Sequence, residues 1–218
     1  ERWADAFDLA CARVSERLET FIDGAGNYYF NMGAYTYFWS RLDALPPDIK
    51  RQEKVAYWLV TAALATNNRK RLNSHAGPIL RQSVAPDIRA SAAVASPGDG
   101  MLTETSHAIR TLRSPATLRA HGFALSWTGQ RDEPIRLFRE AMQLAEREGA
   151  DHLVVACGVD IAEAEIRKGN YRSGAEWTEW ALAEYERRGL HDSLRRLSAI
   201  AINCFARLLL GEVSKADR

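Results

Sequence analysis

The segment GFALSWTGQRDEPIRLFREAM at residues 122–142 and the segment VDIAEAEIRKGNYRSGAEWTEWAL at residues 159–182 decide the fold. Each places a glycine between two stretches whose apolar residues recur every three or four positions, which is the period of a helix face. Superposition of the two segments puts Gly129 on Gly169, so the period is roughly 40 residues, a length typical of helical repeats. This period predicts a repeat of helical hairpins, each of which shares its core with its neighbour.

Turn signals at comparable spacing extend this organisation over the chain. The candidate turn residues recur at similar intervals from one end to the other: Gly33, Asn67, Gly98, Gly129, Gly169 and Gly211. No stretch alternates with period two for long enough to predict a strand. We therefore predict an all-α superhelix of antiparallel hairpins, one domain over 1–218 with irregular hairpins at 1–113 and regular repeats at 114–218. The helical pattern at Glu1 and the turn after Gly211 lead us to expect a piece of a longer protein.

In the N-terminal half the pattern of helices and turns is less regular. Helices are expected at about 3–22, 48–66, 70–84 and 102–112, and a short alanine-rich helix from Pro86 to a loop at 96–100. Gly24 and Gly26 predict an interruption at 23–27, because glycine is unfavourable inside a helix. Ser114 is expected to cap the helix that follows, with Pro115 in its first turn.

Aromatic residues concentrate at residues 28–39, in the sequence YYFNMGAYTYFW. Such a cluster could be a stacking platform for bases or sugars, and with a carboxylate such as Asp23 it could form the site of an all-α enzyme. The favoured interpretation is a hydrophobic core, because aromatic side chains bury large areas.

The composition limits the partners. Of the 218 residues, 46% are hydrophobic, and 29 basic side chains nearly balance 28 acidic ones. A net charge of +1 does not favour binding driven by phosphate neutralisation, and the cations at 69–71 are interpreted as a solvated turn. No export signal and no apolar run long enough to span a bilayer is visible, so we expect no membrane partner and a cytoplasmic location. The odd number of cysteines, Cys11, Cys157 and Cys204, predicts buried thiols and no disulfide framework.

The sequence specifies no catalytic chemistry. None of the five histidines stands in an HxxxH pair or beside a cysteine at ligand spacing, so no metal site is predicted. A nucleophile elbow and a phosphate-binding loop are also missing, so neither a catalytic residue nor a cofactor is predicted. The prediction is a non-enzymatic chain.

The first helix of each hairpin is expected to line a concave groove. By matching positions, Arg119, Phe123 and Trp127 would lie there in one repeat, Val159, Glu163 and Arg167 in the next, and Phe205 in the third. Aromatic rings beside a guanidinium and a carboxylate suit an extended peptide or a small polar ligand. The alternative is that these rings only pack on neighbouring helices. Trp177 and Trp180, on the second helix, are expected to face solvent or the next repeat.

The stretch 118–144 resembles a tetratricopeptide repeat (TPR). The matching residues are Leu118, Gly122, Leu125, Gly129, Phe138 and Ala141. Pro134 and His121 depart from the pattern, and the second copy matches at fewer positions. The resemblance implies a binding scaffold whose groove holds a protein, a peptide or a small-molecule inducer.

Repeats lengthened to this period, with phrases such as REAMQLAEREG, are similar to the sensor domain of maltose-regulator-like signal-transduction ATPases, which often end in a LuxR-type DNA-binding domain. This similarity implies a sensor or scaffold module of a bacterial transcriptional regulator, which does not itself bind nucleic acid. A peptide-binding domain of a quorum-sensing regulator is the alternative with the same fold.

Overall fold

The computed structural model describes residues 2–12, 18–32, 34–65, 85–95, 100–190 and 194–212. Within these ranges the regular secondary structure is helical, so the predicted all-α class is confirmed. The chain divides into two compact units, Glu1–Leu112 and Arg113–Arg218, and each is described by itself.

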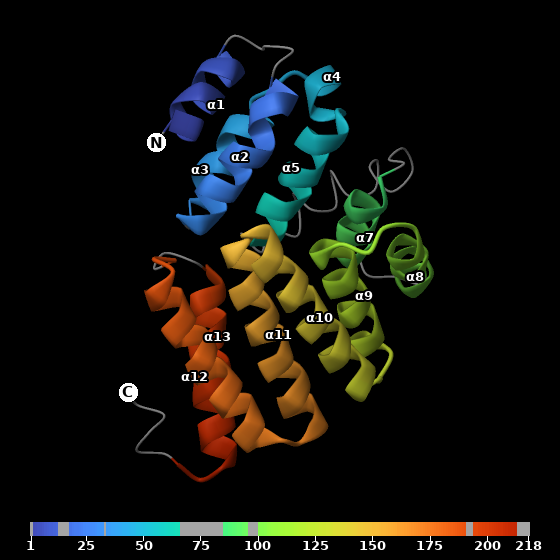
Figure 1. Cartoon of the computed structure of the whole chain (residues 1–218), viewed down its shortest axis with the longest axis vertical. Helices are drawn as coiled ribbons and strands as arrows, with labels where there is room; N and C mark the ends of the chain where they lie inside the picture. The colour runs from blue at the N-terminus through green and yellow to red at the C-terminus, as the bar shows by residue number, and fades with distance from the viewer. Residues whose placement is uncertain are drawn as a thin grey trace. The chain divides into compact units, whose positions relative to one another are not determined.

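The N-terminal unit contains short helices (Figure 1). They are α1 (Arg2–Ala12), α2 (Leu18–Asn31), α3 (Tyr35–Asp43), α4 (Pro47–Lys50), α5 (Glu53–Ala65), α7 (Pro86–Ala95) and α8 (Met101–Thr111). The predicted helix at 70–84, the turns at Asn67, Gly33 and Gly98 and the cations at 69–71 lie outside the described residues.

The predicted interruption at residues 23–27 is wrong. Helix α2 continues through Gly24 and Gly26 to Asn31. A β-carbon on Gly26 would lie 2.3 Å from the Trp58 ring of α5, so the glycine allows that ring to pack against the backbone of α2. The packing of a large ring offsets the low helix propensity of this glycine.

The aromatic stretch forms the core of the N-terminal unit, as the favoured interpretation predicted. Phe38 is completely buried, and its ring centroid lies 5.1 Å from that of Phe7, 5.3 Å from Tyr29 and 5.7 Å from Trp58. The Asp23 carboxylate accepts hydrogen bonds from Lys54 Nζ at 2.7 Å and Trp58 Nε1 at 3.0 Å. These rings are therefore used in packing, and Asp23 helps to join α2 to α5.

The C-terminal unit consists of longer, antiparallel helices that follow one another in space as in sequence (Figure 1). They are α9 (Pro115–Trp127), α10 (Asp132–Glu148), α11 (Asp151–Lys168), α12 (Tyr171–Arg187) and α13 (Leu194–Leu209). Helices α9, α11 and α13 are the first helices of three successive hairpins, and α10 and α12 are the second helices of two. We call the two kinds A helices and B helices.

The turn residues behave as the repeat predicts. Gly129 has a φ of 84° and Gly169 a φ of 91°, a left-handed conformation that glycine adopts without steric cost. Ser114 and Thr117 form a reciprocal capping box at the start of α9, which confirms the predicted cap. Asp132 and Asp151 are the first residues of α10 and α11, where a carboxylate interacts favourably with the helix dipole.

The expectation for the two tryptophans of α12 is wrong for Trp177 and holds in part for Trp180, whose core cluster includes Ala199 of α13 in the next repeat. Both are partly buried: Trp177 packs on the cluster of Ile135, Phe138, Ile161 and Ala164, and Trp180 packs on α11. The Trp177 ring therefore fills space between the B helix and the elements that precede it, and the Trp180 ring packs beside residues of both α11 and α13.

Candidate binding face

Equivalent positions on the three A helices form two rows. Phe123, Glu163 and Phe205 each precede their turn glycine by six residues, and Trp127, Arg167 and Leu209 precede it by two. Helix α11 contacts both α9 and α13, so equivalent positions on these helices are neighbours. We call these six residues, together with Arg119, the A face.

The A face has exposed apolar side chains on both sides and an ion pair in the middle. Trp127 on α9 is 62% exposed, and Phe205 and Leu209 on α13 are 52% and 45% exposed. On α11, Arg167 Nη2 lies 2.6 Å from Glu163 Oε1. Exposed apolar side chains gathered on neighbouring helices are more typical of a binding surface than single ones scattered over a protein, so the arrangement suits a binding surface.

The side chains of Arg119 and Phe123 pack on each other, and Phe123 also packs on Phe138. The Arg119 guanidinium lies 5.1 Å from the centroid of the Phe123 ring, and that ring meets the edge of Phe138 with centroids 5.4 Å apart. The structure thus brings four of the six predicted site residues together as two pairs, Arg119 with Phe123 and Glu163 with Arg167. Trp127 and Phe205 lie on either side, on α9 and α13.

Asp160, which the sequence analysis did not select, connects the three A helices. Its side chain is fully buried and accepts hydrogen bonds from Arg119 of α9 and Arg195 of α13. The desolvation of Arg119 opposes its charged form, but attraction by Asp160 outweighs this effect and raises the pKa of Arg119. A charged residue inside the apolar run CGVDIA was the available signal, because such a group needs a partner when it is buried.

Val159, expected in the groove, lies instead in the core beside Val155 and Tyr185. Helix α11 packs on both sequence neighbours, α10 and α12, and contacts α9 and α13 as well. Only the end of α11 near its C-terminus, with Arg167, is exposed.

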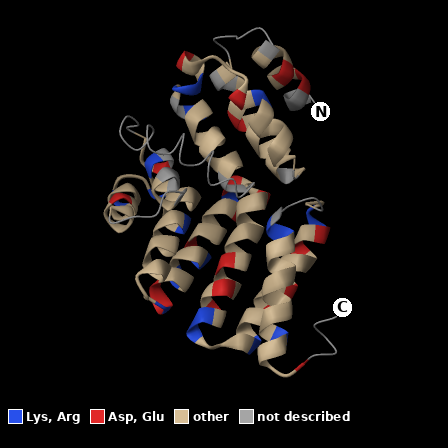
Figure 2. Ribbon diagram, turned by 180° about the vertical axis from the view of Figure 1, so that it is seen from behind, with Lys and Arg blue, Asp and Glu red and all other residues tan. Residues whose placement is uncertain are grey.

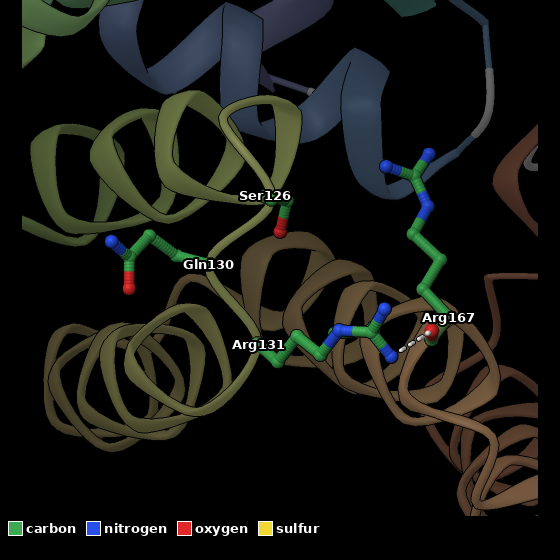
Figure 3. Close-up of a pocket in the computed structure, with 6 residues that line it drawn as sticks. Ser126, Gln130, Arg131 and Arg167 are labelled. Atoms are coloured by element: carbon green, nitrogen blue, oxygen red, sulfur yellow. Dashed lines mark hydrogen bonds between the residues drawn. The ribbon is translucent and has the colours of Figure 1, made fainter.

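A small hollow of about 110 Å³ lies beside the row of Trp127 and Arg167. Its lining residues come from the end of α9, the following turn and α11: Ser126, Gly129, Gln130, Arg131, Ala164 and Arg167. Figure 3 shows Ser126, Arg131 and Arg167 around the hollow, with the Gln130 side chain directed away from it. Arg131 Nη1 donates a hydrogen bond of 3.2 Å to the Arg167 carbonyl oxygen (Figure 3).

A larger hollow, of about 600 Å³, lies between α10 and α11 and carries charges of both signs. Asp132, Glu140 and Glu165 line it together with Arg136, Arg139 and Lys168. Lys168 Nζ is paired with Asp132 at 2.5 Å. The same mixture of basic and acidic residues is visible along the helices of Figure 2, in keeping with the nearly neutral composition.

The described parts of the chain contain no group of three or more histidine, cysteine or acidic side chains that could hold a metal ion. Burial, assisted by the charge of Arg119, lowers the pKa of His152 to about 4, so this histidine is neutral at pH 7. Among the described helices, none has the length and apolar character needed to cross a membrane.

Comparison with solved structures supports the fold. A crystal structure described as a thermophilic TPR protein of Thermus thermophilus matches with a TM-score of 0.57 and 15% sequence identity. The match covers 84% of this chain and 99% of the other. No family model and no curated protein matches the chain. The chain therefore has a TPR-like fold of α-hairpins, as the repeat pattern predicted.

Proposed function

We propose that the chain is a non-enzymatic protein-binding scaffold whose A face holds a segment of a protein or a peptide. The observation that carries this proposal is the exposure of Trp127 and Phe205 on either side of the Glu163–Arg167 pair. Tryptophan and arginine are enriched among the residues that dominate binding energies, since they combine a large contact area with directed polar groups. An extended segment would bury the rings and orient its polar groups on the ion pair.

The experiment that tests this proposal starts from peptides selected on the purified chain from a random phage-displayed library. We expect the double variant Trp127→Ala, Arg167→Ala to bind these peptides at least about tenfold more weakly, a loss of about 1.4 kcal/mol. Its thermal unfolding should stay within a few degrees of wild type, because both side chains are at least half exposed.

The matched control is the double variant Leu9→Ala, Arg172→Ala. Leu9 is 53% exposed on α1 and Arg172 is exposed on α12, so a large apolar and a basic side chain are again removed, at positions outside the A face. Equal loss of binding in both double variants, or a parallel loss of stability and binding in the first, would favour the packing interpretation of these residues.

We further propose that the binding module is the sensor or scaffold part of a bacterial transcriptional regulator in the cytoplasm. The support is the style of the repeats, with the long period that separates Gly129 from Gly169 and with arginine- and glutamate-rich B helices. A peptide signal or a small-molecule inducer would then occupy the A face. Transcript profiles of the source bacterium should change in the same way for a gene deletion and for Trp127→Ala, Arg167→Ala, whereas unchanged profiles would count against a regulatory role.

A further inference from the structure

We propose that two copies of the chain associate through an apolar stripe on α13, with the two α13 helices antiparallel about a two-fold axis. The stripe consists of Leu197, Ile200, Ala201, Cys204 and Leu208. Leu197 and Leu208 are 61% and 53% exposed, and the buried residues Ala199 and Ala206 lie on the opposite side of the helix. The A face uses other residues of α13, so this inference goes beyond the proposed function.

The preceding hairpin shows what kind of element covers such a stripe. Val155, Gly158 and Ile166 precede Gly169 by the same numbers of residues as Leu197, Ile200 and Leu208 precede Gly211. The Trp180 ring of α12 lies over Gly158, and Val155 shares a core cluster with Tyr185 of α12. A β-carbon on Gly174 of α12 would lie 2.4 Å from Cγ1 of Ile166. Helix α12 therefore packs along this side of α11.

Helix α9 follows the same rule. Gly122 corresponds to Cys204 in its distance from the turn glycine, and a β-carbon on Gly122 would lie 2.6 Å from the Phe138 ring of α10. Both complete hairpins thus cover this side of the A helix with an antiparallel B helix. Helix α13 has the same side apolar, but in the described part of the chain no B helix follows it. The stripe is therefore suited to accept one more antiparallel helix.

A second copy of α13 fits the stripe in size and register. With the two-fold axis between Ile202 and Asn203, Leu197 of each copy meets Leu208 of the other, and Ala201 meets Cys204. The large side chains then lie at the two ends and the small ones at the centre, where they allow the helix axes to approach closely. Such an interface is self-complementary, as a two-fold dimer requires.

The charges on α13 do not oppose this pairing. Arg195, Arg196 and Arg207 form ion pairs within their own chain, with Asp160, Glu186 and Glu179 in that order. Two neutral apolar stripes therefore meet without repulsion between arginines. Burial of both stripes removes on the order of 1,000 Å² from water, close to the lower limit for a specific interface. We therefore expect a weak dimer with a dissociation constant on the order of 10 μM.

The test measures molecular mass by sedimentation equilibrium of the purified chain between about 1 and 300 μM. Leu197→Lys and Leu208→Glu should each weaken self-association at least about tenfold, because a charge is then buried against a leucine. An equimolar mixture of the two variants should dimerise at least about tenfold more tightly than either variant alone. In the mixed dimer the lysine meets the glutamate at one end, and the two leucines meet at the other.

The charge-matched control is Leu9→Glu, which changes a leucine that is 53% exposed on α1 and should leave the association unchanged. Thermal unfolding of all three variants at about 1 μM should stay within a few degrees of wild type, because each leucine is at least half exposed. The Cys204 thiol gives an independent measure. It should react rapidly with a disulfide reagent in the dilute chain, and more slowly as the chain concentration rises and the dimer covers it.

A chain that stays monomeric up to 300 μM overturns the inference, since the stripe would then need another partner. A dimer that persists in both Leu197→Lys and Leu208→Glu overturns it as well, because it would use another surface. Failure of the mixed variants to dimerise more tightly than each alone contradicts the antiparallel register. Loss of association in Leu9→Glu would show that the effect of the charge is not specific to the stripe.

Discussion

The Trp180 ring of α12 packs on the backbone of Gly158 in α11, so closely that a β-carbon there would lie 2.2 Å from Cζ3 of the ring. We predict that Gly158→Ala destabilises the chain by about 1–3 kcal/mol, since the added methyl group forces the ring and the helix apart. Urea denaturation measures this difference. Gly100→Ala is the control: its β-carbon would meet no atom within 4 Å, so the change should stay within about 0.5 kcal/mol.

Asp160 should be the most sensitive charged residue of the C-terminal unit. Asp160→Asn leaves two arginines without their shared carboxylate, and we expect a loss of about 3 kcal/mol, because the carboxylate is fully buried. Thermal or urea denaturation measures the loss. Glu163→Gln, which breaks an exposed pair on the same helix, should cost less than about 0.5 kcal/mol. Similar costs for the two variants would show that the network of Asp160 adds little stability.

His152 should make stability depend on pH. Its pKa falls from 6.5 to about 4 in the folded chain, because burial and the charge of Arg119 disfavour protonation. The unfolded chain therefore binds a proton more readily, and stability decreases as pH falls through the window from 6.5 to about 4. Between pH 7.5 and pH 5 the wild type should lose about 2 kcal/mol more than His152→Gln. If the stability of the two proteins changed with pH in the same way, the low pKa of His152 would be contradicted.

The three cysteines should differ in reactivity. Burial raises the pKa of Cys157 to about 12 and that of Cys11 to about 11, whereas Cys204 on α13 is partly exposed. At pH 8 a colourless disulfide reagent should modify Cys204 at least about a hundredfold faster than the other two thiols. Cys204→Ser should remove the fast phase, and denaturant should make the remaining thiols react. A fast phase that persists in this variant would place another thiol at the surface.

The sequence pattern predicts the C-terminal unit well because one local rule repeats there. Gly129, Gly169 and Gly211 all adopt a positive φ, as expected of residues that end an A helix. Gly26 shows where such a rule fails: the same residue type lies inside α2, where it admits the Trp58 ring from α5, a helix further along the chain. Whether a glycine ends a helix or permits a close approach depends on a partner that local propensity does not include.

The site was less predictable than the fold. Matching of repeat positions selected Trp127, Arg167 and Phe205, because it depends only on spacing from the turn glycines. Whether Val159 or its neighbour Asp160 lies on the side of α11 that meets α9 and α13 depends on the rotation of α11 about its axis. Successive residues of a helix are turned by about 100° from one another. Since α11 is covered on most of its sides, its apolar pattern does not mark one exposed face, and the arginines that bind Asp160 lie far from it in the sequence.

The most direct test of the central claim is to map a library-selected peptide on the ¹⁵N-labelled chain by chemical-shift perturbation. A binding scaffold that uses the A face predicts the largest changes at Trp127, Glu163, Arg167 and Phe205, on α9, α11 and α13. Perturbations concentrated on the B helices α10 and α12, or in the N-terminal unit, would contradict it.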